Sequence, residues 1–173
     1  MVFLIFVITV IAVIGFVSYK YYKTLVTNIF DKLIMLDSVF ENRYKELTSA
    51  ISQFLKYVPE HKDLITDIQR AKADASKLSR PKTTQELAHK ILNENALTIN
   101  VKYLIDKCDF DNINPNLKEC LIKQAELINK IGQTSKEYNK LITDYKNIKN
   151  IFPFNLYSKM MQVDLDFDLI KTE

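Results

Sequence analysis

The sequence predicts an all-α protein in which an N-terminal transmembrane helix continues into an elongated antiparallel four-helix bundle. Three observations lead to this fold class: an uncharged apolar run over residues 2–19, apolar residues that recur every three or four positions in the remainder, and a shortage of chain-breaking residues. The 173 residues include only 2 Gly and 4 Pro, which disfavours the turns of a sheet and Gly-rich phosphate loops. A chain of this length suits one domain plus an anchor.

Residues 2–19 form the predicted anchor. They carry no charged side chain, and as a helix they would extend roughly 27 Å, close to the thickness of the hydrocarbon core of a bilayer. Lys20 and Lys23 follow directly. Three aromatic side chains lie at the same exit, where the headgroup region favours them: Tyr19, Tyr21 and Tyr22. We therefore expect the lipid bilayer to contact residues 2–19.

Two alternatives to an anchor are a cleaved signal peptide and a buried helix of a soluble protein. A signal peptide needs a basic n-region, a shorter apolar core and an A-x-A-like cleavage site, and this sequence has none of them. A buried amphipathic helix would keep a polar face, which an all-apolar run does not provide. Both alternatives are therefore less consistent with the sequence than a membrane anchor.

The first helix of the bundle is expected to continue the anchor without a break, because no Pro or Gly lies between Tyr19 and Val58. Pro59 is expected to end it. One face of this helix is apolar throughout, and its members are Leu25, Ile29, Leu33, Leu36, Phe40, Tyr44, Leu47, Ile51, Phe54 and Val58. Such a stripe predicts a face that packs against other helices.

Three further helices are expected over about 60–78, 83–108 and 115–153. Thr83 and Glu86 form a capping box, and the segment 109–116 has the composition of a loop. The expected inward residues are Leu64, Ile65, Ile68, Ala71, Ala75 and Leu78 in the second helix, Leu87, Ile91, Val101 and Leu104 in the third, and Leu117, Leu121, Ala125, Ile128, Ile131, Tyr138, Ile142, Tyr145 and Ile148 in the fourth. Ser135 interrupts the fourth stripe, and Gly132 weakens that helix.

The domain organisation follows from these elements. Residues 1–22 are the transmembrane anchor, residues 23–161 the helical bundle, and residues 162–173 an acidic, amphipathic C-terminal tail. The tail alternates three carboxylates with apolar residues: Asp164, Asp166 and Asp168. An EF-hand would also need Gly at its sixth and Glu at its twelfth position, and both are missing. A tail that docks on the bundle or on a partner is the better interpretation.

Several short motifs fall in an order seen in a known family. The segment YNKLITDYKNIKNIFPFNLYSKMM (138–161) contains Tyr138-Asn139, Tyr145, Phe152-Pro153 and Asn155-Leu156. Further matches upstream are Tyr22, Leu25, Val26, Asp37, Arg43-Tyr44, Tyr57, Arg70-Ala71, Pro115 and Leu117-Lys118. On these motifs the chain resembles the LemA family over nearly its whole length, as a divergent member.

The departures from the family pattern are local. Residues 45–50 replace the run Asp-Leu-Ile-Pro-Asn-Leu of the family, and Ser135 stands in place of an Arg. The resemblance implies a single-pass membrane protein with an elongated helical domain. The family is largely without an assigned biochemical activity, so the resemblance bears on architecture more than on function.

The sequence predicts no catalytic residue, no cofactor and no metal ligand. His61 and His89 lie on different predicted helices, and neither has neighbours that complete a zinc site or a triad. Motifs of the P-loop, H-E-x-x-H and G-x-S-x-G types are absent from the sequence. The tyrosines on the apolar stripes are expected to be core residues, with a ligand groove as the alternative: Tyr44, Tyr57, Tyr138 and Tyr145.

The function that the sequence favours is a membrane-tethered scaffold or interaction module, which binds another protein or associates with itself. A lipid-binding or ligand-binding module and an enzyme are the alternatives. A formal net charge of +3 from 24 basic and 21 acidic residues is too mild for a nucleic-acid partner. By the positive-inside tendency, we expect a cell-membrane protein whose C-terminal domain is cytoplasmic, with Cys108 and Cys120 as free thiols. An exported helical domain behind an uncleaved anchor is the alternative.

Overall fold

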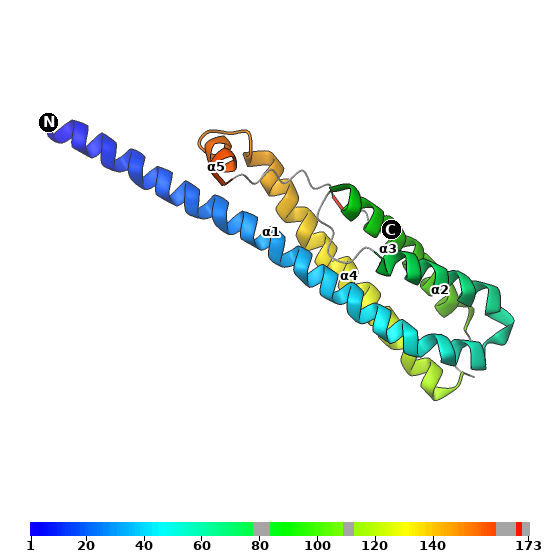
Figure 1. Ribbon diagram of the computed structural model, residues 1–173. Helices are drawn as coiled ribbons and strands as arrows, with labels where there is room; N and C mark the ends of the chain where they lie inside the picture. Colours follow the sequence, from blue (N-terminus) through cyan, green and yellow to red (C-terminus); the bar gives the residue numbers. More distant parts are fainter. Residues whose placement is uncertain (78–83, 109–112, 162–168, 171–173) are drawn as a thin grey trace. The chain divides into compact units, whose positions relative to one another are not determined.

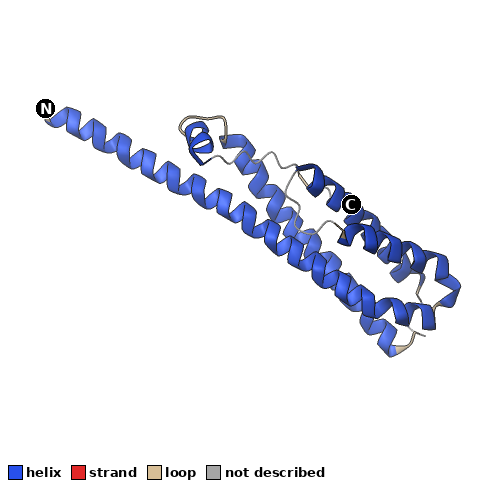
Figure 2. Ribbon diagram, viewed as in Figure 1, coloured by secondary structure: helices blue, strands red, loops and turns tan. Residues whose placement is uncertain are grey.

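The computed structural model describes residues 1–77, 84–108, 113–161 and 169–170, and these residues form helices without any strand (Figures 1 and 2). In chain order the elements are α1 (Val2–Tyr57), the short 3-10 helix η1 (Pro59–His61), α2 (Lys62–Ser76), α3 (Thr84–Lys107), α4 (Pro115–Ile148) and α5 (Phe154–Met161). The all-α class and the long apolar N-terminal helix are thereby confirmed.

The chain divides into two compact units. Unit 1 comprises Met1–Leu33 and Glu137–Leu169, and unit 2 comprises Ile34–Lys136 and Ile170–Glu173. Each unit therefore receives part of α1 and part of α4. The two units are described separately below.

Helix α1 has 56 residues, as the absence of breakers predicts. Its most apolar 18-residue window has a mean hydropathy of 2.8, and no residue of that window is buried. The helix is therefore long and apolar enough to cross a membrane. It ends at Tyr57, and Pro59, which cannot donate a backbone hydrogen bond, opens η1.

Unit 2 is built around one apolar core to which four helices contribute. Its fully or nearly fully buried members are Leu47, Ala50 and Phe54 from α1, Val58 from the turn, Ile65 and Ile68 from α2, Leu97, Val101 and Leu104 from α3, Cys108, and Leu117 and Leu121 from α4. Most of these residues lie on the predicted stripes. Helices α2 and α3 lie side by side in this unit (Figure 1).

Unit 1 joins the first part of α1 to the last part of α4 and to α5. Its buried side chains are Tyr22, Leu25, Val26 and Ile29 from α1, and Tyr138, Ile142 and Tyr145 from α4. Lys32 and Glu137 form a salt bridge of 2.5 Å in the same unit. The predicted burial of the tyrosines Tyr138 and Tyr145 on the fourth helix is confirmed.

Two details differ from the sequence-based expectation. Helix α4 ends at Ile148, short of the expected Pro153, and the residues after that proline form the helix α5. Tyr22, which we expected at the headgroup level, is fully buried against other aromatic rings. Thr83 of the capping box, Leu78 and the aspartates of the tail lie outside the described residues.

Candidate functional site

The most unusual feature of unit 2 is a group of charged side chains that α1 and α3 bury between them. Helix α3 contributes Lys90 and Glu94, which are 1% and 3% exposed, and α1 contributes Arg43, which is fully buried. Charged residues are almost never fully buried unless they are paired. Asp37 and Tyr44 of α1, which are partly buried, supply partners for two of them.

The hydrogen bonds of this buried network centre on the Glu94 carboxylate. Arg43 Nη1 donates to Glu94 Oε2 at 3.3 Å and to Thr98 Oγ1 at 2.8 Å. The Tyr44 hydroxyl donates to Glu94 Oε1. Lys90 forms an ion pair with Asp37. The two cations and two carboxylates balance, so the buried network carries no formal net charge.

Burial shifts the pKa of the network's central groups in opposite directions. Desolvation lowers the pKa of Arg43, although the neighbouring Glu94 opposes this shift. Desolvation also raises the pKa of Glu94, and its bonds from Tyr44 and Arg43 only partly offset the effect. The pKa of the Tyr44 hydroxyl is raised by burial and by the nearby carboxylate. Tyr44 therefore stays protonated and acts as a hydrogen-bond donor.

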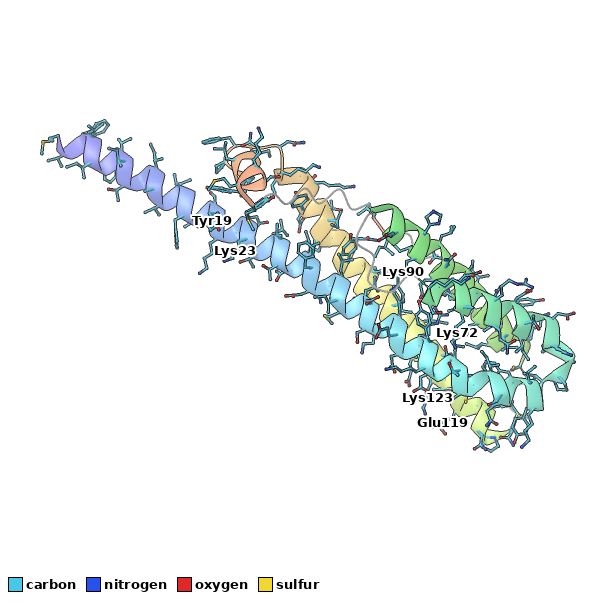
Figure 3. All side chains as sticks on the ribbon, in the orientation of Figure 1. Tyr19, Lys23, Lys72, Lys90, Glu119 and Lys123 are labelled. Carbon is cyan, nitrogen blue, oxygen red and sulfur yellow. The ribbon has the colours of Figure 1, made fainter. Side chains whose placement is uncertain are left out.

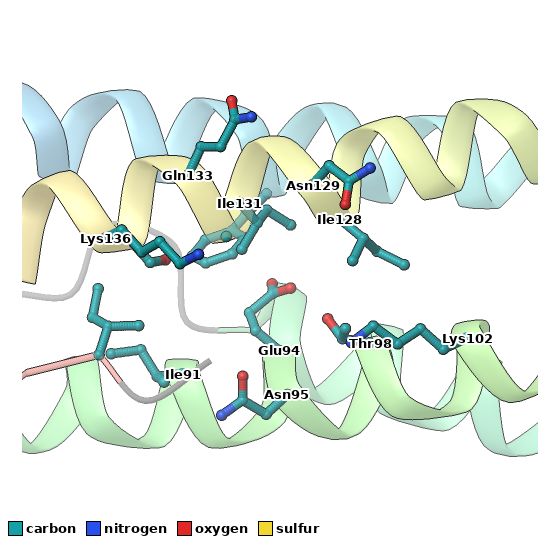
Figure 4. A pocket seen from close by; sticks show the side chains of 14 residues that line it. Ile91, Glu94, Asn95, Thr98, Lys102, Ile128, Asn129, Ile131, Gln133 and Lys136 are labelled. Atoms are coloured by element: carbon teal, nitrogen blue, oxygen red, sulfur yellow. The ribbon is translucent and has the colours of Figure 1, made fainter. Parts of the chain in front are cut away.

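A cavity of about 420 Å³ adjoins the buried network. Figure 4 shows Glu94 and Thr98 reaching from α3 toward α4, and Ile128 reaching from α4 toward α3. The polar side chains of its lining are Glu94, Asn95, Thr98, Lys102, Asn129, Gln133, Ser135 and Lys136, and the apolar ones are Phe40, Ile91, Ile128, Ile131 and Ile170. Its volume is in the range of small-molecule sites.

The buried residues of the cavity lining include the polar Ser135 and the apolar Ile170. Ser135 is fully buried, and its hydroxyl has no hydrogen-bond partner among the described residues. Ile170, a described residue of the predicted C-terminal tail, is 3% exposed. It forms part of the cavity wall.

Sequence reasoning missed Lys90 and Glu94. A charged residue on a helix is normally assigned to the solvent face, so neither was counted among the inward positions of α3. A signal was nevertheless present. Steps of seven and then four residues back from the inward Val101 lead to Glu94 and to Lys90, and such positions share one face of a helix.

The other residues considered from the sequence do not come together. His61 belongs to η1 and His89 is exposed on α3. Within the described part of the chain, no three His, Cys, Asp or Glu side chains are close enough to hold a metal ion. Cys108 and Cys120 are both free thiols, and burial raises the pKa of each.

The described groups therefore form a charge-balanced network beside a cavity of mixed polarity, in which Arg43 Nε and Nη2 have no hydrogen-bond partner among the described residues. Such a network can favour one register of α1 against α3, because a shift of either helix would separate Arg43 from Glu94 and Lys90 from Asp37. Comparison with protein-family models finds no match for the chain, and comparison with curated proteins finds no significant match.

Proposed function

We propose that this protein is a single-pass membrane-anchored scaffold or interaction protein of the cell membrane, which holds a helical body at the bilayer surface. The observation that carries this proposal is the start of α1. An 18-residue apolar window without a buried residue would expose a large apolar surface to water, whereas soluble proteins rarely show patches above a few hundred Å². Insertion of residues 2–19 into a bilayer removes that cost.

We further propose that the body is an elongated antiparallel four-helix bundle of a divergent LemA family member. The core of unit 2, to which four helices contribute, supports the bundle. Asp37, Arg43 and Tyr44, which are among the positions that carry the family resemblance, take part in the buried network. If these three residues hold α1 and α3 in register, that role gives a structural reason for their place in the family pattern.

The interaction role is supported by the outer face of α3. Leu92, Ile99 and Tyr103 are 66%, 51% and 52% exposed. The spacings of seven and four residues between them place all three on one helix face, which is the arrangement of an amphipathic helix whose apolar side meets a partner. We therefore assign the partner surface to this face. A scaffold of this kind needs no catalytic group.

Membrane insertion is tested by extraction of the full-length protein. Because hydrophobic insertion is not screened by ions, the protein should stay with the membrane pellet in high salt and in alkaline carbonate. A variant that begins at Lys20, and so keeps the buried Tyr22, should appear in the supernatant with its helical circular dichroism intact. Release of the full-length protein by carbonate would refute the anchor.

The proposed cytoplasmic location of the body is tested by cysteine labelling. Cys108 is buried and would react slowly, so a better probe is a single cysteine at the exposed Ala73, with both native cysteines replaced. A membrane-impermeant maleimide should label Ala73→Cys only after the cells are permeabilised. Labelling of intact cells would place the body outside.

The partner surface is tested by site-specific photo-crosslinking in native membranes. A photo-reactive amino acid at Ile99 should give a discrete crosslinked band, either to another protein or to a second copy of the chain. The same residue placed at the exposed Lys130 of α4 is the matched control and should give none. Equal crosslinking from both positions would mean that the α3 face has no special role.

A second candidate function is the binding of a small polar molecule, and the cavity beside the buried network favours it. Ser135 offers a buried hydroxyl, and Lys102 and Lys136 would attract an anionic group such as a carboxylate or phosphate. A panel of small carboxylates and phosphates should then raise the melting temperature of the full-length protein. Gly132 also lines the cavity, so Gly132→Leu, which places a larger side chain there, should abolish the shift. No shift with any compound, or the same shift in both proteins, would exclude this function.

A further inference from the structure

Helix α5 is attached to α1 at the level of the proposed anchor. The Tyr157 hydroxyl donates a hydrogen bond of 2.8 Å to the backbone carbonyl of Gly15. Gly15 precedes Tyr19, the last residue of the uncharged run, by four positions, or about 6 Å of helix. Within unit 1, α5 therefore lies beside the last turn of the apolar segment (Figure 1).

Aromatic contacts reinforce this attachment. The ring centroids of Tyr157 and Tyr19 are 5.5 Å apart, and those of Phe154 and Tyr21 are 6.2 Å apart. Tyr22 adds contacts of 6.3 Å to Phe154 and 6.1 Å to Tyr157. All of these distances are within the range of favourable aromatic pairs. Figure 3 shows Tyr19 on α1 close to α5.

Another side of α5 is apolar and is exposed among the described residues of unit 1, 137–161 and 1–33. Phe154 and Tyr157 lie three residues apart and face α1, whereas Leu156 and Met160 lie four apart on another face, 48% and 75% exposed. The preceding turn adds Ile151 and Phe152, at 56% and 75% exposed. Two large apolar side chains are thus three-quarters exposed beside the proposed membrane exit.

From this placement we propose that the segment 151–161 is a second membrane contact, in which Phe152, Leu156 and Met160 insert into the boundary between headgroups and acyl chains. The occupant of the apolar face is membrane lipid, because the contacts of Tyr157 with Gly15 and Tyr19 hold α5 beside the end of the apolar segment that would cross the bilayer. Short amphipathic helices bind in the plane of this boundary, with basic residues at their polar edge. Lys159 is exposed on α5, and Lys20 and Lys23 are exposed on α1.

This inference rests on the proposed transmembrane anchor, so its test needs a separate measurement of the anchor. The full-length protein, with its native cysteines replaced, carries one cysteine labelled with an environment-sensitive fluorophore in nanodiscs that hold a single copy. Labels at Phe152 and Met160 report on α5, and a label at Val13 reports on the anchor. A label at Asn147, exposed on α4 in the same unit, is the aqueous control.

We expect the labels at Phe152 and Met160 to emit at shorter wavelength than the label at Asn147, and to be quenched most by lipids whose quencher lies near the headgroup. The label at Val13 should be quenched most by lipids with a deep quencher. If the Val13 label is deep but those at Phe152 and Met160 match Asn147, the membrane contact of α5 is refuted while the anchor remains. An aqueous Val13 label would instead refute the anchor.

A second copy of the chain is the competing occupant of this face. It would give blue-shifted Phe152 and Met160 labels only in vesicles at a high protein-to-lipid ratio, and not in nanodiscs with one copy. That result would overturn the proposal. The variant Leu156→Ser with Met160→Ser should reduce the blue shift at Phe152 in single-copy nanodiscs, because it removes apolar area from the inserted face. An unchanged shift in this variant would also contradict the proposal.

Discussion

Breaking the buried pair of Arg43 and Glu94 should destabilise unit 2 far more than the number of its hydrogen bonds suggests. In Glu94→Ala the guanidinium stays buried with Thr98 as its remaining partner. Removing one member of a buried ion pair typically costs about 3 to 5 kcal/mol, because the other charge is left without compensation. For a protein of this size that corresponds to a fall in melting temperature of roughly 6 to 20 °C. Arg43→Met should have a similar effect.

The double variant Arg43→Met with Glu94→Leu separates charge burial from packing. It removes both desolvated charges and leaves the hydroxyls of Tyr44 and Thr98, which are partly exposed and can bond to water. Replacing a buried pair by apolar residues is often neutral or stabilising. We therefore expect the double variant to be more stable than either single variant, with a coupling energy toward the upper end of the ~0.5 to 3 kcal/mol found for contacting residues.

The assay is denaturant unfolding of the full-length protein in detergent micelles, followed by circular dichroism. The matched control is the exposed pair of Glu119 and Lys123 on α4, 2.9 Å apart, which Figure 3 labels. Lys123→Ala should not change the unfolding midpoint measurably, because solvent screens such a pair. If the effects of Arg43→Met and Glu94→Leu simply add, the two residues are not coupled and the reasoning is refuted.

Three further predictions concern packing, helix propensity and pH. Tyr138→Ala and Tyr145→Ala should each lower the free energy of unfolding by about 3 to 5 kcal/mol. Tyr103→Ala, at an exposed position, is the control and should change it little. Unchanged stability of the first two variants would show that Tyr138 and Tyr145 are not core residues. Gly132→Ala should raise the free energy of unfolding by roughly 0.5 to 1 kcal/mol, because Ala is the better helix former and the added Cβ meets no atom within 4 Å. A lower unfolding midpoint for this variant would contradict the prediction. Burial raises the pKa of Glu94, so above the ordinary glutamate pKa the folded state binds more protons than the unfolded state. The stability of the wild type relative to Glu94→Gln should therefore fall as pH rises through the raised pKa. The urea midpoints of both proteins between about pH 4 and about pH 8 check this, and a stability advantage of the wild type that grows with pH would contradict it.

The helices could be predicted from the sequence because apolar periodicity reports burial directly. Positions such as Leu47, Phe54, Leu117 and Leu121 follow a step of three or four residues and are fully buried. The ends of the helices are predicted less accurately than their buried faces. Helix α4 stops at Ile148, the last residue of the predicted stripe, and not at Pro153.

The candidate site could not be predicted in the same way. Lys90 and Glu94 look like ordinary surface charges until Arg43, Tyr44 and Asp37 are placed opposite them, and that pairing depends on how α1 and α3 align. The cavity depends in addition on side-chain volumes from three helices and on Ile170. Periodicity within one helix contains no information about such long-range complementarity.

The composition of unit 1 has a consequence for biogenesis. Its two parts, Met1–Leu33 and Glu137–Leu169, are separated by about 100 residues, so at typical synthesis rates of ~5 to 20 residues per second the second part follows the first by roughly 5 to 20 s. During this interval an anchor can already be inserted, while Tyr22, Leu25 and Ile29 lack the residues that bury them. If the anchor inserts as proposed, a ribosome that stops before Glu137 would release a membrane-bound chain whose Tyr22, Leu25 and Ile29 are uncovered. Quality-control proteases recognise incompletely folded products of this kind.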